Sequence, residues 1–154
     1  MTEQKKFVPD ILVGPSVLEQ KDVDGINRLM KQLFDKAQEI SRGKLTDILC
    51  QPNFRMIIFK DPDTNEVIGM ASLYCYKALY APGGVGRVED VVIDERYRGK
   101  GLGKLIMQCL ISLAKNRQLE TLELTSNPQR VEANILYPKL GFNKHDTNYY
   151  VMDL

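Results

Sequence analysis

Apolar residues at helical spacing predict two helices in the first half of the chain. Asp22 is a suitable N-cap for a helix that extends to about Ile40. A second, shorter helix is predicted from Leu45 to Cys50, before Pro52. The first helix is amphipathic, so one of its faces is expected to be buried. The apolar positions of that helix are Val23, Ile26, Leu29, Met30, Leu33, Phe34 and Ala37.

Runs of apolar and β-branched residues predict strands on either side of these helices. Ile11–Val17 fits a short first strand, and its internal glycine and proline place it at a sheet edge. Arg55–Lys60 and Val67–Tyr76 flank the segment 61–65, whose Asp, Pro and Asn residues are typical of a turn. We therefore predict that these two runs form a hairpin.

In the second half of the chain, the sequence pattern predicts a loop followed by alternating strands and helices. A loop at residues 82–84, rich in glycine and proline, leads into a buried strand from Val85 to Ile93. A helix follows with one apolar face, formed by Leu102, Leu105, Ile106, Cys109, Leu110 and Leu113. The remaining predicted elements are a strand at Thr121–Thr125, a helix at Gln129–Tyr137 and a final pair of strands within Phe142–Asp153.

The number and order of these elements predict one α/β (α+β) domain, residues 1–154, built on a mixed sheet. The length of 154 residues suits one domain, since domains commonly hold about 100 to 200 residues. The 21 Lys and Arg residues balance the 20 Asp and Glu residues and leave a net charge of +1. Such a chain has no general field that attracts nucleic acid or an anionic membrane, so neither is expected as a partner.

Several other classes of protein are disfavoured by composition. No apolar run approaches the roughly 20 residues of a membrane span, and the polar start has no secretory signal, which predicts a cytoplasmic protein. Cys50, Cys75 and Cys109 are odd in number and lack CxxC spacing, and His145 is the single histidine. We therefore expect neither a disulfide framework nor a metal site.

The segment Arg98–Lys104 carries the clearest chemical signal, because it places three glycines between a strand and a helix. Glycines let a ligand approach the main chain, and the free N–H groups of a helix N-terminus suit a phosphate. A P-loop is excluded by the short spacing and by Leu105, which stands where Ser or Thr would bind magnesium. A dinucleotide fingerprint is excluded because Ile106 replaces its third glycine.

Arg98, Gly101 and Gly103 instead fill the pattern Arg/Gln-x-x-Gly-x-Gly/Ala, which resembles the acetyl-CoA pyrophosphate loop of the GNAT superfamily of N-acetyltransferases. Further along, Ala133–Phe142 is similar to the AxxxYxxLGF signature of the same superfamily. The resemblance covers the whole chain in element order and is closest from Val85 to the end. It implies the GNAT fold, with a mixed, mostly antiparallel central sheet of six or seven strands flanked by about four helices.

The resemblance also implies that acetyl-CoA is the cosubstrate and that no metal takes part. Backbone groups of Val91, Val92 and Ile93 are then expected to hold the pantetheine arm. A backbone N–H of the strand, left unpaired by a bulge, is expected to polarise the thioester carbonyl. The pyrophosphate is expected at the backbone amides of Arg98, Gly99, Lys100, Gly101, Leu102, Gly103 and Lys104.

Three residues of the next loop and helix complete the expected cosubstrate site. Asn127, Arg130 and Asn134 lie where superfamily members contact pantetheine or phosphates. Asn127 is equally suited to cap the helix that follows Pro128. Many superfamily members have asparagine at the position of Arg130. Because this residue is arginine here, we expect its side chain to bind phosphate instead of the pantetheine amides.

Acetyl transfer to an amine needs a base for the amine and an acid for the leaving thiolate. Tyr137 occupies the superfamily position of the acid, with simple packing at a helix end as the alternative; Pro138 is expected to kink or end that helix. Glu89 is the preferred base, direct or through water, and is expected to be desolvated. Asp90 is the second choice, because neighbours in a regular strand face opposite sides unless a bulge intervenes. The third alternative is that Glu89 only pairs with Arg87 or another neighbour.

The main hypothesis for function is an acyltransferase that moves the acetyl group of acetyl-CoA to a primary amine of a small molecule, by direct attack in a ternary complex. Arg87–Val92 and Arg98–Leu105 are similar to the same runs of glucosamine 6-phosphate N-acetyltransferases, which makes that sugar phosphate an alternative acceptor. A peptide or protein N-terminus is another alternative acceptor. A non-enzymatic alternative is a binding module that senses acetyl-CoA without turnover. The presence of Tyr137 and Glu89 favours an enzyme, and a homodimer is one option for its assembly.

The acceptor pocket is expected among the variable parts of the chain: the first helix, the Leu79–Gly86 loop and the C-terminal strands. Three tyrosines near the end of the third strand either line this pocket or pack against neighbours. They are Tyr74, Tyr76 and Tyr80.

Overall fold

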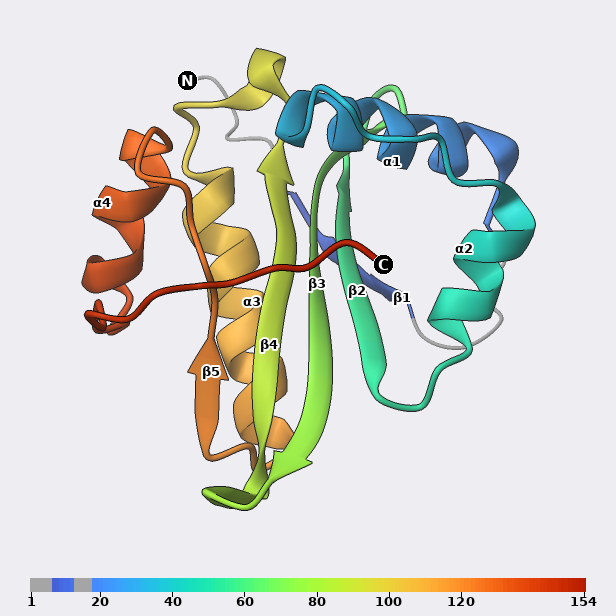
Figure 1. Cartoon of the computed structure of the whole chain (residues 1–154). Coiled ribbons are helices and arrows are strands. Elements are labelled where there is room, and N and C mark those ends of the chain that lie inside the picture. The colour runs from blue at the N-terminus through green and yellow to red at the C-terminus, as the bar shows by residue number, and fades with distance from the viewer. Residues whose placement is uncertain (1–6, 13–17) are drawn as a thin grey trace.

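A central sheet with helices on both faces organises the chain (Figure 1). The structure is a computed structural model and describes residues 7–12 and 18–154. Its strands are β1 (Pro9–Leu12), β2 (Phe54–Lys60), β3 (Val67–Ala78), β4 (Ala81–Ile93) and β5 (Thr121–Glu123). Its helices are α1 (Gln20–Leu33), α2 (Arg42–Leu49), α3 (Leu102–Asn116) and α4 (Val131–Lys139), with a 3-10 turn at Glu95–Tyr97.

The strands lie in the order β1-β2-β3-β4-β5, and β1 to β4 pair with one another in antiparallel fashion. Strand β5 pairs with β4 in parallel. The mixed, mostly antiparallel sheet and the four α-helices confirm the predicted fold class. The predicted count of six or seven strands is too high, since the described residues form five.

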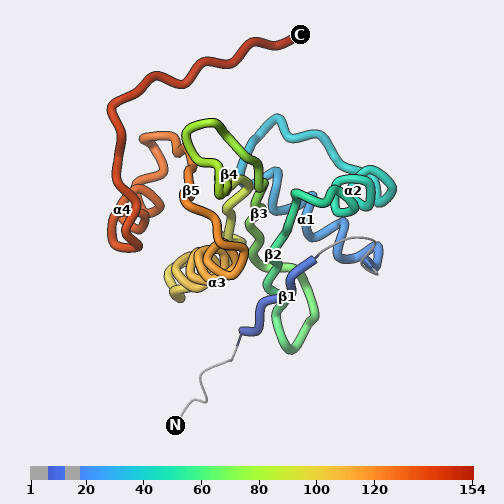
Figure 2. Tube along the Cα trace, turned by 90° about the horizontal axis from the view of Figure 1, so that it is seen from below, coloured from blue at the N-terminus to red at the C-terminus, as the bar shows by residue number. Residues whose placement is uncertain are grey.

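Two hydrophobic clusters hold the helices to opposite faces of the sheet (Figure 2). Helices α1 and α2 pack on one face, where Met56 and Ile58 of β2 are buried. Helix α3 packs on the other face with Ile57 and Phe59, and Tyr137 of α4 belongs to the same cluster. Successive side chains of a strand alternate between faces, so the continuous apolar run of β2 serves both clusters.

Helix α1 is shorter than its apolar pattern predicted. It begins before Asp22, because Glu19 is the N-cap and its N–H donates to Asp22 Oδ2 at 3.2 Å in a capping box. It ends at Leu33, because the chain then turns back along the helix. The side-chain amide of Asn27 exchanges hydrogen bonds of 2.9 and 3.0 Å with the backbone of Ile40. The predicted helix is therefore wrong at both ends.

Two strand boundaries also differ from the prediction. Ala78 pairs with Ala81, so residues 82–84 already belong to β4 and are not the predicted loop. The predicted first strand, Ile11–Val17, overlaps β1 in its first two residues, and residues 13–17 lie outside the described residues. Its predicted place at the sheet edge is confirmed.

The segment after Phe142 forms no strand, so the predicted pair of strands within Phe142–Asp153 is wrong. This segment, hereafter the C-terminal tail (residues 143–154), leaves the body of the molecule after α4 (Figure 2), and its Tyr149 ring centre lies 5.6 Å from the Arg87 guanidinium. Tyr150 and Met152 expose 84% and 81% of their surface. A strand requires a neighbouring backbone edge, and no ladder of the described residues includes the tail.

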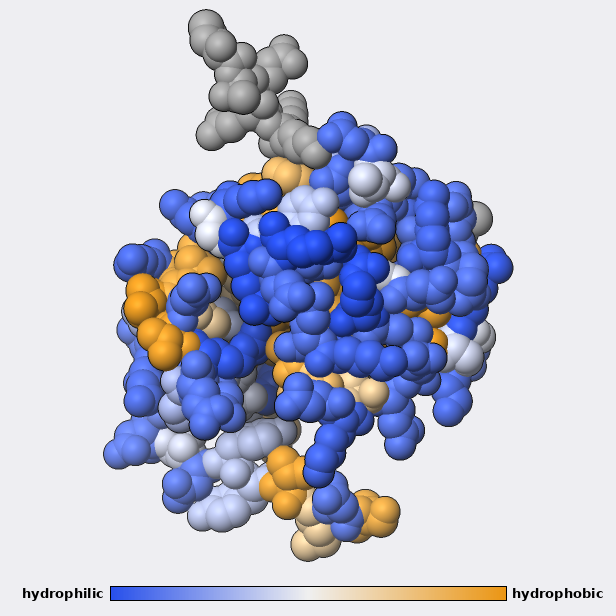
Figure 3. Space-filling model, turned by 90° about the horizontal axis from the view of Figure 1, so that it is seen from above, coloured by the Kyte–Doolittle hydropathy of each residue, from blue (hydrophilic) through white to orange (hydrophobic). Residues whose placement is uncertain are grey.

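None of the helices in residues 7–12 and 18–154 combines the length and the apolar character needed to cross a membrane. The outer surface of α1, seen from above, is mostly hydrophilic (Figure 3). Its opposite side buries Val23, Ile26 and Leu29, which confirms the predicted amphipathic helix.

Candidate active site

Strand β4 contains a bulge at the position where the sequence places two adjacent carboxylates. Met70 pairs with Val92 and Ser72 pairs with Glu89, so two residues of β4 lie opposite one residue of β3. One of the two is Asp90, whose φ of +54° is in the left-handed region. A bulge of this kind re-aims side chains and leaves backbone groups outside the ladder.

The bulge places both carboxylates on the face covered by α1 and α2. Met70 and Tyr74 pack in the cluster of that face, and Ser72 lies between them with the same orientation. The hydroxyl of Ser72 donates to Asp90 Oδ2 at 2.5 Å, and Glu89 is the cross-strand partner of Ser72. The condition set by the sequence, that both carboxylates share a face only with a bulge, is therefore met.

Glu89 and Asp90 occupy different environments on this face. Glu89 Oε1 accepts a hydrogen bond from Arg87 Nε at 2.7 Å, and its side chain is 41% exposed, so the expected desolvation of Glu89 is wrong. Burial raises the pKa of Asp90, the hydrogen bond from Ser72 opposes this rise, and the charge of Glu89 adds to it. Burial, then the charges of Asp90 and Glu89, raise the pKa of Tyr74. The surroundings of Asp90 therefore favour its protonated form.

The glycine-rich loop lies at the N-terminus of α3, as predicted. Gly101 is the N-cap of the helix with φ +80°, and Gly99 has φ +74°. A Cβ added at either glycine would meet nothing within 4 Å, so the backbone there is open to a ligand. The free N–H groups of the first helical turn make this end of α3 suitable for a pyrophosphate.

Two of the three basic residues of the loop have local contacts. Arg98 Nε donates to the Ile93 carbonyl at 3.1 Å, and Lys100 Nζ lies 4.9 Å from the centre of the Tyr97 ring. Lys104 is exposed on the first turn of α3. All three positive charges are thus near the predicted phosphate site.

The start of this loop is anchored by Asp94, which is fully buried at the end of β4. Arg96 donates to its carboxylate at 2.9 and 3.1 Å, and Arg28 of α1 approaches it at 3.4 Å. Hydrogen bonds from Arg96 hold the pKa of Asp94 at about 2 despite its burial. Gln32 of α1 accepts a hydrogen bond from the Glu95 N–H at 3.0 Å. Helix α1 therefore supports the loop from the opposite face.

The loop between β5 and α4 brings the three predicted polar residues together. Asn127 Oδ1 accepts from the Gln129 N–H at 2.9 Å within the turn before α4, and the N-cap of α4 is Arg130, so the capping alternative for Asn127 is wrong. Asn134 Nδ2 donates to the carbonyls of Asn127 and Arg130 at 2.8 and 3.0 Å. Arg130 Nη2 donates to the Val91 carbonyl at 2.7 Å, across the space between α4 and β4.

Tyr137 is buried in the cluster beneath α3, with its ring 6.0 Å from that of Phe142. Burial raises the pKa of Tyr137, and the positive charge of Arg130 lowers it in part. The phenol therefore stays protonated at neutral pH, as an acid must. Helix α4 continues through Pro138 and ends at Lys139, in agreement with the expected end near Tyr137.

Two residues of this region were not singled out from the sequence. Ser72, which holds Asp90, is a polar residue in the middle of an apolar strand, and that contrast was an available signal. The Ser126 hydroxyl oxygen, next to Asn127, is buried with no hydrogen-bond partner in the described part of the chain. No pattern marks it in the sequence. An orphaned buried polar atom fits a region that receives a ligand.

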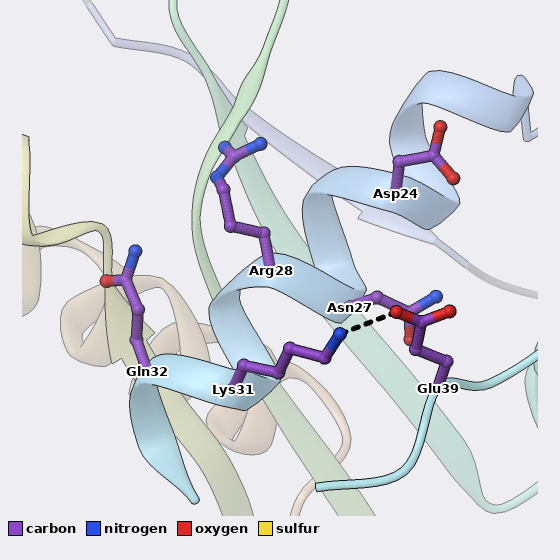
Figure 4. Close-up of a pocket in the computed structure, with 6 residues that line it drawn as sticks. All are labelled: Asp24, Asn27, Arg28, Lys31, Gln32 and Glu39. Carbon is purple, nitrogen blue, oxygen red and sulfur yellow. Dashed lines mark hydrogen bonds and ion pairs between the residues drawn. The ribbon is translucent and has the colours of Figure 1, made fainter. Parts of the chain in front are cut away.

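A separate open pocket of about 520 Å³ lies on the outer face of α1 (Figure 4). Its lining includes Lys31 and Glu39, which form an ion pair of 2.5 Å, and Arg28 and Gln32, which support the glycine-rich loop. No predicted site residue lines it. Within the described ranges, no three His, Cys, Asp or Glu side chains are grouped as metal ligands.

Known proteins resemble this chain in sequence and in fold. The family model described as "Acetyltransferase (GNAT) family" matches residues 26–142. A glucosamine 6-phosphate N-acetyltransferase of Trypanosoma brucei brucei is 28% identical over 134 residues, which are 84% of this chain and 88% of the relative. The crystal structure of an acetyltransferase of Trypanosoma brucei superposes with a TM-score of 0.78 at 25% identity and covers 97% of this chain and 100% of its own. The structure of glucosamine-6-phosphate N-acetyltransferase from Arabidopsis thaliana has a TM-score of 0.77 at 22% identity, covers 94% of this chain and 98% of its own, and shares the fold.

Proposed function

Because this chain belongs to the acetyltransferase (GNAT) family, we propose that it transfers the acetyl group of acetyl-CoA to the primary amine of a small molecule, by direct attack in a ternary complex. Acetyl-CoA supplies the activated acetyl thioester. The observation that carries the proposal is the bulge in β4, which sets Asp90 and Glu89 on the sheet face covered by α1 and α2, in the strand that precedes the glycine-rich loop. We take this face as the acceptor face.

The proposed cosubstrate site uses the backbone of Val91, Val92 and Ile93 for the pantetheine arm and the amides from Arg98 to Lys104 for the pyrophosphate. The open space at Gly99 and Gly101 supports this assignment, because a phosphate there meets main-chain N–H groups without a side chain in the way. Asn127 and Asn134 are held by backbone contacts and keep the start of α4 in place.

We assign the two carboxylates different roles. Glu89, paired with Arg87 and partly exposed, attracts the ammonium group of the acceptor. Asp90 accepts the proton, because burial favours its protonated form more than that of an ordinary aspartate. Tyr137 donates a proton to the departing thiolate, and its buried phenol is protonated at neutral pH.

Glucosamine 6-phosphate is the acceptor we place first. The support is the Trypanosoma brucei brucei relative with that name, which aligns with 84% of this chain, together with the similar runs at Arg87–Val92 and Arg98–Leu105. Two carboxylates on the acceptor face suit the amine of such a sugar, because they favour a cation.

We also propose that the protein forms a homodimer through its C-terminal tail. Tyr149, Tyr150, Val151 and Met152 expose between 66% and 84% of their surface in an extended segment. Large apolar side chains exposed together are typical of an interaction surface.

The test is thiol release from acetyl-CoA by the purified protein, with glucosamine 6-phosphate, glucosamine and a short peptide with a free N-terminus compared at equal concentrations. We expect turnover with glucosamine 6-phosphate that exceeds the other two by about tenfold or more. If a different amine were acetylated instead, the proposed acetyl transfer would hold and the proposed acceptor would be wrong. Binding of acetyl-CoA without turnover of any amine would instead favour the sensing module.

A further inference from the structure

Strands β4 and β5 share only a very short ladder. The two strands pair at Val85–Arg87 and Thr121–Glu123 and separate after that (Figure 1). The remaining part of β4, residues 88–93, pairs with β3 on one side and with no strand on the other in the described ranges. Backbone carbonyls on that free edge need other donors, because unpaired buried carbonyls cost free energy.

Arg130 supplies one such donor. Its Nη2 lies 2.7 Å from the carbonyl oxygen of Val91, directly after the bulge. The backbone of Arg130 is fixed at the start of α4, since its N–H donates to Asn127 and its carbonyl accepts from Asn134. The side chain therefore extends from a rigid base to the free edge of β4.

This bond satisfies the guanidinium incompletely. The carbonyl of Val91 is neutral, and no ion pair of Arg130 is present in the described part of the chain. Charge-assisted hydrogen bonds to an anion are roughly twice as strong as those to neutral acceptors, and arginine fits phosphate in a bidentate manner. A nearby phosphate would therefore compete well for this side chain.

The predicted phosphate site lies at the same end of the molecule. Helices α3 and α4 both begin at the top of the sheet as drawn in Figure 1. The first turn of α3 also borders α4, because a Cβ added at Gly103 would lie 3.8 Å from Leu136. Arg130, at the N-cap of α4, therefore contacts β4 at the end of the sheet where the glycine-rich loop also lies.

We propose that Arg130 is a specificity-determining residue that exchanges hydrogen-bond partners. In the free protein its guanidinium binds the Val91 carbonyl. When coenzyme A binds, one of its phosphates binds the guanidinium, and the Val91 carbonyl becomes available to the pantetheine arm. This inference rests on the proposed function. A phosphate-free pantetheine has to break the Arg130 bond without compensation, whereas coenzyme A replaces it with a stronger one. Arg130 thereby selects the complete coenzyme over shorter thiols.

The experiment compares the dissociation constants of coenzyme A and of pantetheine for the wild type, Arg130→Met and Arg130→Lys, by NMR titration or calorimetry. Arg130→Met removes the donor and the charge. We expect it to bind pantetheine about fivefold more tightly and coenzyme A about tenfold more weakly. Arg130→Lys keeps the charge, so it is expected to recover most of the affinity for coenzyme A. Arg117→Met, an exposed arginine at the end of α3, is the matched control and should change neither constant.

Opposite changes in the two constants distinguish the exchange from other roles. If both ligands weaken by the same factor, Arg130 only maintains the structure and the proposal is overturned. If only coenzyme A weakens, Arg130 contacts phosphate but does not occupy the pantetheine position, and the exchange is also overturned. A wild type that binds neither ligand contradicts the proposed function itself, which is a separate result.

Discussion

Ser72 on β3 donates its hydroxyl to Asp90 on β4 at 2.5 Å, although Asp90 has no place in the regular ladder between the two strands. Ser72 is fully buried, so this bond is shielded from water. The bond fixes the side chain of the bulged residue on the same face as Glu89. A carboxylate held in this way is pre-oriented toward an acceptor that approaches from the α1 and α2 side.

The pH dependence of turnover tests the role of Asp90. A base acts when it is deprotonated, so a raised pKa moves the acidic limb of kcat/KM above the ordinary aspartate value of about 4. We expect Asp90→Asn to lose this limb and to lower kcat/KM by about 10² to 10⁴. Ser72→Ala should shift the limb to higher pH, because the hydrogen bond from Ser72 favours the ionised form.

Glu89→Gln is the comparison for this prediction. Glu89 is paired with Arg87, so we expect the variant to raise the KM of the amine and to keep the acidic limb. If Glu89→Gln lost the acidic limb of kcat/KM and Asp90→Asn kept it, Glu89 would be the base and Asp90 would have the binding role.

Coenzyme binding tests the glycine-rich loop. Gly103→Val places a side chain in the first turn of α3, where an added Cβ has an ordinary contact of 3.8 Å, so the fold should be retained. We expect calorimetry to show a loss of acetyl-CoA affinity of about tenfold or more, because the side chain obstructs the pyrophosphate. Gly101→Val should weaken binding as well, and its φ of +80° adds backbone strain. Gly43→Val, at an open glycine of α2, is the control. If the folded Gly103→Val variant bound acetyl-CoA as tightly as the wild type, the pyrophosphate would not bind at the glycine-rich loop.

Acid catalysis by Tyr137 is tested by Tyr137→Phe, which keeps the buried ring and removes the proton donor. We expect kcat to fall by about 10² to 10⁴ with little change in the affinity for acetyl-CoA. Tyr150→Phe, at an exposed position of the tail, is the matched control. Turnover near that of the wild type would leave Tyr137 as a packing residue.

Acid stability depends on Asp94. Its folded pKa of about 2 lies below the unfolded value of about 3.9, so the ionised carboxylate stabilises the fold above pH 4. This contribution is lost as the pH falls from about 4 to 2. We expect Asp94→Asn to lower the free energy of unfolding by roughly 2 kcal/mol at pH 7 and to flatten its dependence over that range, as measured by urea titrations. Asp47→Asn, exposed on α2, should behave as the wild type.

Removal of residues 147–154 tests the proposed dimer. The full chain is expected to have about twice the monomer mass of 17.6 kDa by light scattering, and the shortened chain the monomer mass. A monomeric full chain at micromolar concentration would show that the tail has another role.

The sequence alone was sufficient for the features that depend on neighbouring residues. The glycines and basic residues of Arg98–Lys104, the apolar face of α3 and the hairpin of β2 and β3 all have local patterns, and the structure places them as predicted. The resemblance to GNAT proteins rested on such local motifs and was confirmed by the family match. Short-range periodicity and turn chemistry determine these elements because few distant contacts compete with them.

The tertiary structure decided the features that require residues distant in sequence. Asp90 turns toward Ser72 because β3 and β4 pair with a one-residue mismatch, and no single strand reveals the register of its neighbour. Asn27 ends the predicted course of α1 by binding Ile40, and Arg130 reaches Val91 only after α4 has been placed beside β4. The tail has strand-like residues but forms no ladder with any strand of the described ranges. Hydrogen bonds between distant segments depend on packing, and packing is a property of the whole fold.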